Sequence, residues 1–257
     1  MSSVSDQCYM CDSPATSREH VPPKCIFPEQ KDMAGQDYRS DLITVASCDV
    51  HNLRKAKDDE FLMVSLAGIL GNNSIGYRHK LTKVNRAIRR SAGRLLDAVF
   101  KARKHFVVKT NDNAFIEVIW GTPDYSRLEC CFSHVALGLY FHQFGERFRG
   151  QHKILMSHLH HSEKNPATFS RFIQHKAQID LVGIVPIGRN PDVFYYQFSA
   201  PDQFGILLLR MCFYQGVDIF VSFIPEGTEI PGNFAMRLIQ SGIKTYIGLG
   251  DATYEFN

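Results

Sequence analysis

The amino-acid sequence predicts an α+β protein, with a small N-terminal module followed by a larger domain of mixed helices and antiparallel strands. Three observations lead to this prediction. The chain has 257 residues and is 44% hydrophobic, which is enough to bury a sizeable core. Its cysteines cluster near the N-terminus, whereas strand-like apolar runs dominate its last third. The pattern divides the chain into residues 1–60, residues 61–105 and residues 106–257.

The seven cysteines do not predict a disulfide framework. Their number is odd, and Cys130 and Cys131 are adjacent within an apolar stretch. The first residues lack the basic and apolar regions of a signal peptide, and no stretch approaches about eighteen apolar residues, the length of a membrane-spanning helix. We therefore expect a cytoplasmic protein without a membrane partner.

Residues 1–60 are expected to form turns, short strands and one helix after Cys48. Pro14, Pro22 and Pro23 interrupt regular structure, and residues 28–40 form a polar loop. A segment of this size cannot bury a core of its own. It is therefore expected to need a bound metal in order to fold.

Two short pairs of cysteine and histidine provide such a metal site. Cys8-x-x-Cys11 and Cys48-x-x-His51 lie about forty residues apart, and each turn offers two ligands to one ion. Thiolate and imidazole ligands favour zinc, and four protein ligands leave no position for water, so this zinc would be structural. Cys25 competes with His51 for the fourth position, and His51 is favoured because its pairing with Cys48 is local. If Cys25 bound the zinc, His51 would be free to bind a second metal.

Residues 61–105 are expected to connect the module to the larger domain through a basic amphipathic helix. Between Arg78 and Lys104 the sequence has ten lysines and arginines and a single acid, Asp97. Apolar residues recur there at helical spacings, which indicates one buried stripe and a broad cationic face. That face predicts contacts with a polyanion, although a solvated surface helix has the same composition. The residues expected to contact nucleic acid are Lys83, Arg86, Arg90 and Arg94.

The remaining chain predicts an α+β domain to which the sequence assigns no role. Apolar runs and turn residues indicate its helices and strands. This domain is a candidate for binding a protein partner or for forming a homodimer. The expected elements are a strand at 114–120, helices at 127–145 and 166–177, a hairpin of 181–187 and 193–198, and a strand at 217–223.

The residues between and beside the two zinc pairs resemble a known family. Glu19-His20 precedes the short run Val21-Pro22-Pro23, and Asn52 follows His51 directly. With the zinc pairs, this order is similar to that of the HNH endonucleases, members of the ββα-metal fold group, in their zinc-stabilised form. The resemblance covers residues 8 to about 60. It implies that His20 is a general base, that Glu19 and Asn52 hold a catalytic Mg²⁺ or Mn²⁺, and that the zinc pairs are structural.

The chemistry of phosphodiester hydrolysis agrees with this assignment. A neutral imidazole can take a proton from water near pH 7, while a hard cation held by carboxylate and amide oxygens offsets charge on the leaving group. Neighbouring strand residues point to opposite faces, so Glu19 and His20 converge only if the strand ends or twists there.

The family's asparagine that orients the histidine has no counterpart in residues 41–47. Asp41 or a backbone carbonyl could take its place. Lys55, just after the second zinc pair, is placed to approach a phosphate.

The expected function is that of a metal-dependent endonuclease that hydrolyses phosphodiester bonds in DNA, with RNA as the second substrate. The resemblance implies a role in bacterial or phage defence, restriction or DNA processing. Two alternatives stay open. One is a non-catalytic zinc module that binds nucleic acid or protein, and the other is a subunit of a defence complex that a partner must activate.

Overall fold

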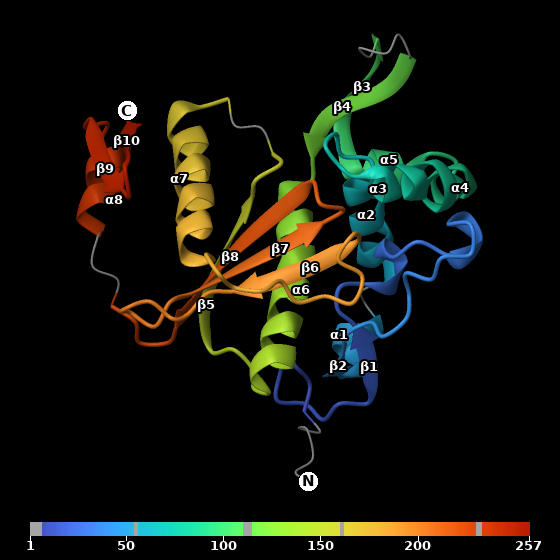
Figure 1. The fold of residues 1–257 in the computed structure, drawn as a ribbon, viewed down its shortest axis with the longest axis horizontal. Coiled ribbons are helices and arrows are strands. Elements are labelled where there is room, and N and C mark those ends of the chain that lie inside the picture. Colours follow the sequence, from blue (N-terminus) through green and yellow to red (C-terminus); the bar gives the residue numbers. More distant parts are fainter. Residues whose placement is uncertain (1–6, 54–55, 110–114, 160–161, 230–232) are drawn as a thin grey trace. The chain divides into compact units, whose positions relative to one another are not determined.

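The computed structural model divides the chain into two compact units, Met1–Glu146 and Arg147–Asn257 (Figure 1). Both units mix helices with antiparallel strands, which confirms the predicted α+β class. In the described part of the chain, no helix combines the length and the apolar character needed to cross a membrane. The described residues are 7–53, 56–109, 115–159, 162–229 and 233–257.

The first unit begins with a two-stranded antiparallel sheet and a short helix. Strand β1 (Ser17–His20) pairs with β2 (Thr44–Ser47), and helix α1 (Asp49–Leu53) follows β2 directly. Strand β1 ends at His20 because the prolines shortly after it have no backbone N–H to donate to a sheet. The connection between the strands contains two 3₁₀ turns, η1 (Lys24–Ile26) and η2 (Gln30–Asp32).

Helix α2 (Ala56–Ala67) supplies much of the core of this unit. Its second half is apolar on nearly every side, and the side chains of Phe61, Leu62 and Met63 are each 1% exposed. A helix with apolar residues all round must be covered by neighbours on several sides. Helix α2 accordingly contacts η1, the basic segment and helix α6 (Tyr125–Phe144).

The basic segment is not the single helix that the sequence predicted. Three helical pieces run without interruption from Ser74 to Arg90, but Ala92 and Gly93 then adopt φ values of 50° and 82°, which end the α-helix. From Phe100 onward the chain is a strand, so the basic residues from Lys101 to Lys104 do not lie on a helix. The pieces are α3 (Ser74–His79), the π-helical turn η3 (Lys80–Val84), α4 (Asn85–Arg90) and α5 (Arg94–Val99).

Two long strands and one long helix complete the first unit. Strands β3 (Phe100–Lys109) and β4 (Phe115–Pro123) pair with each other as an antiparallel ribbon. Helix α6 begins where the Asp124 side chain accepts a hydrogen bond from the Arg127 N–H and ends at Gly145, which has a φ of 74°. Strand β4 and helix α6 confirm the elements predicted at 114–120 and 127–145.

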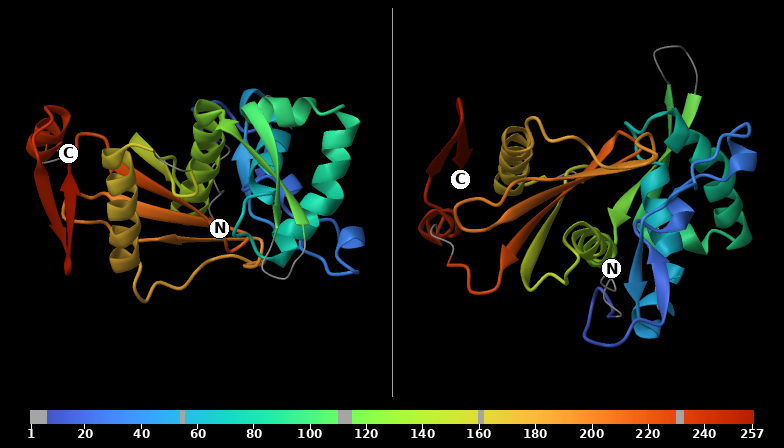
Figure 2. Two further views of the ribbon diagram at one scale, coloured as in Figure 1. Left: turned by 90° about the horizontal axis from the view of Figure 1, so that it is seen from above. Right: turned by 60° about the horizontal axis from the view of Figure 1, so that its bottom comes forward.

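The second unit is built on a four-stranded antiparallel sheet with the order β5-β8-β7-β6. Helix α7 (Lys164–Asp180) lies across one face of this sheet (Figure 2), where Ala177, Leu181, Leu208 and Phe220 form a buried cluster. The strands are β5 (Gly150–Met156), β6 (Phe194–Phe198), β7 (Leu207–Phe213) and β8 (Val217–Pro225). Helix α8 (Asn233–Gln240) and the pair β9 (Thr245–Leu249) and β10 (Ala252–Phe256) follow.

The second unit confirms two of the predicted elements and corrects a third. Helix α7 covers the helix predicted at 166–177, and β8 covers the strand predicted at 217–223. The predicted hairpin is wrong, because β6 pairs with β7 instead of with residues 181–187, of which only Ile187 bridges to Tyr196. The apolar run of β7 offers a longer buried partner than residues 181–187, whose first residue caps α7.

The boundary between the units also differs from the predicted boundaries at residues 60 and 105. Helices α2 and α6 contact each other, and they also contact η1 and β2 of the N-terminal module. The module, the helices and the ribbon therefore form one compact unit up to residue 146.

Candidate metal centre and its surroundings

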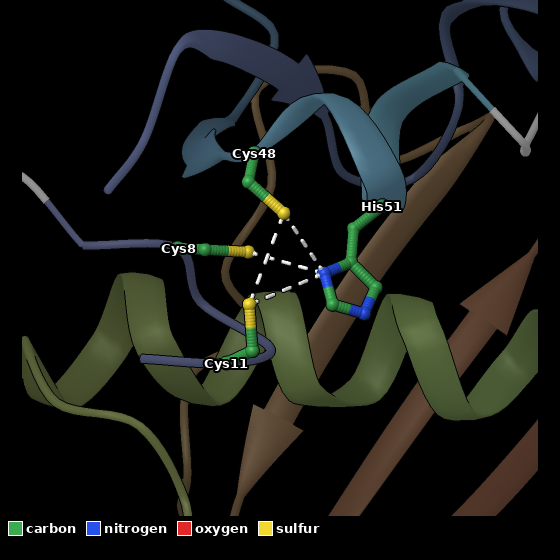
Figure 3. Close-up of side chains that lie close together, drawn as sticks. All are labelled: Cys8, Cys11, Cys48 and His51. Atoms are coloured by element: carbon green, nitrogen blue, oxygen red, sulfur yellow. Dashed lines mark hydrogen bonds between the residues drawn. The ribbon is translucent and has the colours of Figure 1, made fainter. Parts of the chain in front are cut away.

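Two backbone turns bring the four predicted zinc ligands together. Cys8 and Cys11 lie in the turn before β1, and this turn is closed by a hydrogen bond of 2.9 Å from the Cys8 N–H to the Ser13 carbonyl. Cys48 and His51 lie at the start of α1, where the His51 N–H donates to the Cys48 carbonyl at 3.1 Å. A further bond from the Tyr9 N–H to the Ala46 carbonyl, 3.0 Å long, holds the first turn against β2. Figure 3 shows the four side chains pointing toward one another.

The distances within this cluster fit a tetrahedral zinc ion. Zinc bonds of about 2.3 Å to sulfur and about 2.0–2.1 Å to nitrogen place two sulfurs about 3.8 Å apart and a sulfur and a nitrogen about 3.6 Å apart. The Cys11 and Cys48 sulfurs are 3.8 Å apart, and the Nδ1 atom of His51 lies 3.5, 3.6 and 3.2 Å from the sulfurs of Cys8, Cys11 and Cys48. All four ligand atoms lie within 4.8 Å of one another. The cluster is therefore compatible with a structural zinc.

Cys25 takes no part in this cluster. Its thiol donates to the backbone carbonyl of Asp59 at 3.2 Å, and burial raises its pKa to about 12. A thiol with such a pKa remains protonated at neutral pH, whereas zinc binds the thiolate. The sequence offered Cys25 and His51 as candidates for the fourth ligand. The structure brings His51, and not Cys25, close to Cys8, Cys11 and Cys48.

The carboxylate of Glu19 lies inside the module. Its side chain is buried, and its two oxygens accept hydrogen bonds from the Tyr9 hydroxyl at 2.7 Å and from the Ser47 hydroxyl at 3.2 Å. Burial and the Glu19 charge together raise the pKa of Tyr9 well above its usual value, so this hydroxyl keeps its proton. Through these hydrogen bonds, Glu19 connects the turn that contains Cys8 and Cys11 to strand β2.

Asn52 lies on the same face of the sheet as Glu19. Its side-chain Nδ2 donates to the Ser17 hydroxyl at 2.8 Å, and Ser17 and Glu19 are two residues apart on β1. This bond orients the amide, because its nitrogen faces Ser17 and its oxygen lies on the other side. The amide oxygen is the atom that a hard cation prefers.

His20 is on the opposite face of β1 from Glu19. It lies across from Thr44 in the sheet register, on the face that carries Arg18, and it is half-buried. Burial and the nearby Lys24 charge lower the pKa of His20 below its usual value, which favours the neutral imidazole. The structure therefore brings Glu19 and Asn52 to one face and places His20 at the strand end on the other. Asp41, the alternative partner for His20, is exposed with a φ of 50°.

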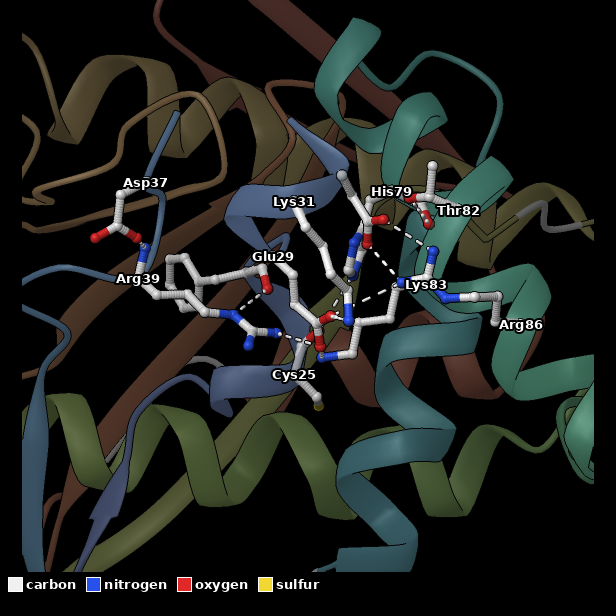
Figure 4. A network of polar contacts seen from close by, with 11 residues as sticks. Cys25, Glu29, Lys31, Asp37, Arg39, His79, Thr82, Lys83 and Arg86 are labelled. Atoms are coloured by element: carbon white, nitrogen blue, oxygen red, sulfur yellow. Dashed lines mark hydrogen bonds and ion pairs between the residues drawn. The ribbon is translucent and has the colours of Figure 1, made fainter. Parts of the chain in front are cut away.

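Two of the residues predicted to contact nucleic acid are engaged in ion pairs (Figure 4). The Lys83 ammonium lies 3.3 Å from the Glu29 carboxylate, and the Arg86 guanidinium makes two hydrogen bonds of 2.8 and 2.6 Å to Asp32. The Asp32 side chain is only 8% exposed, and the hydrogen bonds from Arg86, together with its charge, lower the pKa of Asp32. These pairs join the loop between β1 and β2 to the basic helices.

Arg90 and Arg94 are exposed at the end of α4 and the start of α5. The Arg94 Nε donates to the Ser91 carbonyl at 3.1 Å. Lys55 lies outside the described residues.

Tyr9 and Ser47, which hold Glu19 in place, were not predicted from the sequence. Tyr9 follows Cys8 and Ser47 precedes Cys48. A polar side chain directly beside a predicted metal ligand was the sequence signal that could have identified them. Tyr9 is 1% exposed and Ser47 is fully buried, so neither contacts solvent.

Comparison with known proteins adds no family to these observations. No protein-family model, no curated protein and no solved structure matches the chain. The resemblance to HNH endonucleases therefore rests on the sequence of residues 8 to about 60, and the structure adds to it a cluster of Cys8, Cys11, Cys48 and His51 that could hold a metal ion.

Proposed function

We propose that this protein is a metal-dependent endonuclease of the HNH type, with DNA as its first substrate and RNA as its second. The arrangement of β1, β2 and α1 around a Cys₃His cluster supports this proposal. It is the order of elements in a ββα-metal unit, with a histidine ending the first strand and an asparagine on the helix.

The residues have distinct proposed roles. His20 is the proposed base; it lies at the end of β1 on the face opposite Glu19 and Asn52, so its ring must reach the attacking water past the end of the strand. Burial and the Lys24 charge lower its pKa, which favours the neutral ring that accepts a proton. The Asn52 amide oxygen and Glu19 hold a divalent ion, which when bound offsets negative charge on the phosphate and the leaving group. Glu19 uses one acceptor site on each oxygen for Tyr9 and Ser47, and a carboxylate offers about four such sites.

The exposed arginines extend the proposal to substrate binding. Arg90 and Arg94 are proposed to contact the phosphate backbone, as is Lys55 from the sequence. Lys83 and Arg86 are weaker candidates, since binding a phosphate would compete with their pairing to Glu29 and Asp32.

A plasmid-nicking assay tests the catalytic proposal. The zinc-loaded protein is expected to nick supercoiled DNA when Mg²⁺ or Mn²⁺ is added, and His20→Ala is expected to lower the rate by at least about a hundredfold. The His20 variant should retain its zinc and its circular dichroism spectrum. His152→Ala, a half-buried histidine of the second unit, serves as the matched control and should cut normally. Equal cutting by wild type and His20→Ala would refute the assignment of the base.

One observation favours a second candidate, a non-catalytic zinc module that binds nucleic acid or protein. Both oxygens of Glu19 already accept hydrogen bonds inside the module. Binding of duplex DNA without cleavage in any divalent ion would support this candidate. Cleavage that appears only with an added protein would instead support a partner-activated subunit of a defence complex.

A further inference from the structure

The β3–β4 ribbon projects from the first unit and is exposed on both faces. Figure 1 shows it extending away from the helices of that unit. The sheet register places Lys104, Phe106, Val108 and Trp120 on one face, with His105, Val107 and Lys109 on the other. Large apolar side chains are exposed on each face: Phe106 is 48%, Val107 71% and Trp120 60% exposed. An exposed ribbon with such side chains is a candidate binding surface.

The base of the ribbon is fixed to the unit. At Gly121 a Cβ atom would lie 2.8 Å from the Phe100 Cβ, so the strands approach there more closely than a larger residue allows. The Asp124 N–H donates to the Val99 carbonyl at 3.3 Å, and the Arg103 guanidinium lies 2.9 Å from the Asp97 carboxylate. The ribbon is therefore held at its base and presents the segment from Lys104 to Lys109.

The charge of the ribbon favours a polyanion over a second copy of the same chain. The sequence of β3 contains four cations and no acid, and that of β4 contains one acid, Glu117. Two such ribbons would repel each other, whereas phosphates attract them. The cations of β3 are Lys101, Arg103, Lys104 and Lys109, and its three lysines are exposed.

The dimensions and side chains of the ribbon fit the major groove of a DNA duplex. Paired strands lie about 4.8 Å apart, and a groove about 12 Å wide admits a two-stranded ribbon. Lysines along the strand can reach the phosphates at the groove edges. Exposed apolar side chains such as Phe106 and Val108 can contact the methyl groups of thymine, which lie in that groove.

We propose that the β3–β4 ribbon is a duplex-binding element that enters the major groove of DNA. This inference deepens the proposed nuclease function, because it names the surface that binds the substrate. It differs from the basic helices, which the sequence suggested for this role. The ribbon binds through Lys101, Lys104 and Lys109 at the backbone and through its apolar side chains at the bases.

The fluorescence of Trp120 gives a direct test, because it is the one tryptophan of the sequence. A labelled DNA duplex is titrated into the full protein without added divalent ion, and duplex anisotropy and tryptophan emission are followed together. The emission of Trp120 is expected to change in proportion to binding. Saturated binding with unchanged emission would overturn the proposal, and so would an emission change caused by raising the protein concentration alone, which indicates a second copy.

A lysine series tests the backbone contacts. Replacing Lys101, Lys104 and Lys109 by alanine should weaken binding by about tenfold or more and lower the slope of log K against log salt by about 0.9 per lysine. The matched control replaces Lys153, Lys164 and Lys244 of the second unit, which changes the net charge equally. An equal loss in both triple variants would overturn the proposal.

A third measurement tests whether the ribbon binds in the major groove of the duplex. A duplex with uracil in place of thymine lacks only the methyl groups of the major groove and should bind more weakly. Equal affinity for the two duplexes would overturn the groove assignment.

These outcomes are separate from cleavage. Binding through the ribbon by a protein that never cuts DNA would refute the nuclease proposal alone. Cutting by a protein whose Trp120 does not respond to bound duplex would refute the ribbon proposal alone.

Discussion

The N-terminal module with its Cys/His cluster (residues 8–53) and the sheet of the second unit differ in what can stabilise them. In the module, four side chains converge where one zinc ion fits, and the buried groups include the carboxylates of Glu19 and Asp32. In the described residues of the second unit, the buried polar side chains are neutral, and the face of the sheet under α7 is filled by residues such as Leu208 and Phe220.

This difference follows from size. A short segment buries too little apolar surface to offset the entropy of ordering its chain, so it depends on a metal and on satisfied polar contacts. A four-stranded sheet covered by a helix buries enough apolar surface to need neither. The two regions should therefore respond to different perturbations.

Removing the zinc should have the largest effect, and it should be confined to the first unit, of which the module is a part. Cys48→Ala is expected to abolish zinc binding and to unfold residues 8 to about 53, because structural zinc contributes apparent binding energies of about 10–16 kcal/mol in small zinc domains. Metal analysis should show about one zinc per wild-type chain and almost none in the variant. Limited proteolysis should cut the variant near its N-terminus while leaving the second unit resistant.

Cys25→Ser is the matched control for this prediction. Its thiol donates to the Asp59 carbonyl, a bond that a serine hydroxyl can replace. This variant should keep its zinc. Loss of zinc from Cys25→Ser, or a Cys48→Ala variant that resists proteolysis as well as wild type, would contradict the prediction that zinc bound without Cys25 stabilises the module.

A cavity in the sheet should have an intermediate effect that leaves the zinc in place. Leu209 on β7 is fully buried, and Leu209→Ala is expected to lower the free energy of unfolding by about 2–5 kcal/mol. Urea denaturation followed by circular dichroism would measure the loss. Val182→Ala, at a residue that is 78% exposed, should change stability by less than about 0.5 kcal/mol. Release of zinc from folded Leu209→Ala would show that the two regions are not independent.

Local spacing predicted the metal ligands better than it predicted the other polar contacts. Two ligands within four residues must lie close together whatever the fold, so Cys8, Cys11, Cys48 and His51 were identifiable from the chain. The contacts of Glu19 with Tyr9 and Ser47 depend on how a turn packs against a sheet, which spacing does not encode.

Elements were predictable where their pattern was long and uniform. Helix α6 and strand β8 have continuous apolar patterns, and both were predicted close to their bounds. The break at Ala92 and Gly93 was missed, because the apolar spacing on either side of it still matches a helix. The pairing of β6 with β7 was missed, because the sequence predicted a hairpin with residues 181–187 and did not identify Leu207–Phe213 as a strand.

The smallest predicted effect concerns the ion pairs that hold the loop between β1 and β2 against the basic helices of the first unit. Glu29 lies 2.7 Å from Lys31 and 3.3 Å from Lys83, and Arg39 and Arg86 are nearby. These cations, the Lys31 hydrogen bond above all, lower the pKa of Glu29 from 4.5 to about 2. A carboxyl whose pKa is depressed on folding stabilises the protein above its unfolded pKa, and this contribution is lost as the pH falls from about 4.5 toward 2.

Glu29→Gln should therefore lower the free energy of unfolding at pH 7 by about 1 kcal/mol, since the side chain is partly exposed and solvent screens the pairs. Urea denaturation at low salt would measure this difference, which should shrink at high salt and as the pH approaches about 2, with wild type and variant compared in the same buffer. Glu60→Gln, at an exposed carboxylate of α2, is the control and should have little effect at any pH. A Glu29→Gln effect that does not depend on salt would mean that packing of the side chain, and not its charge, holds this loop against the helices.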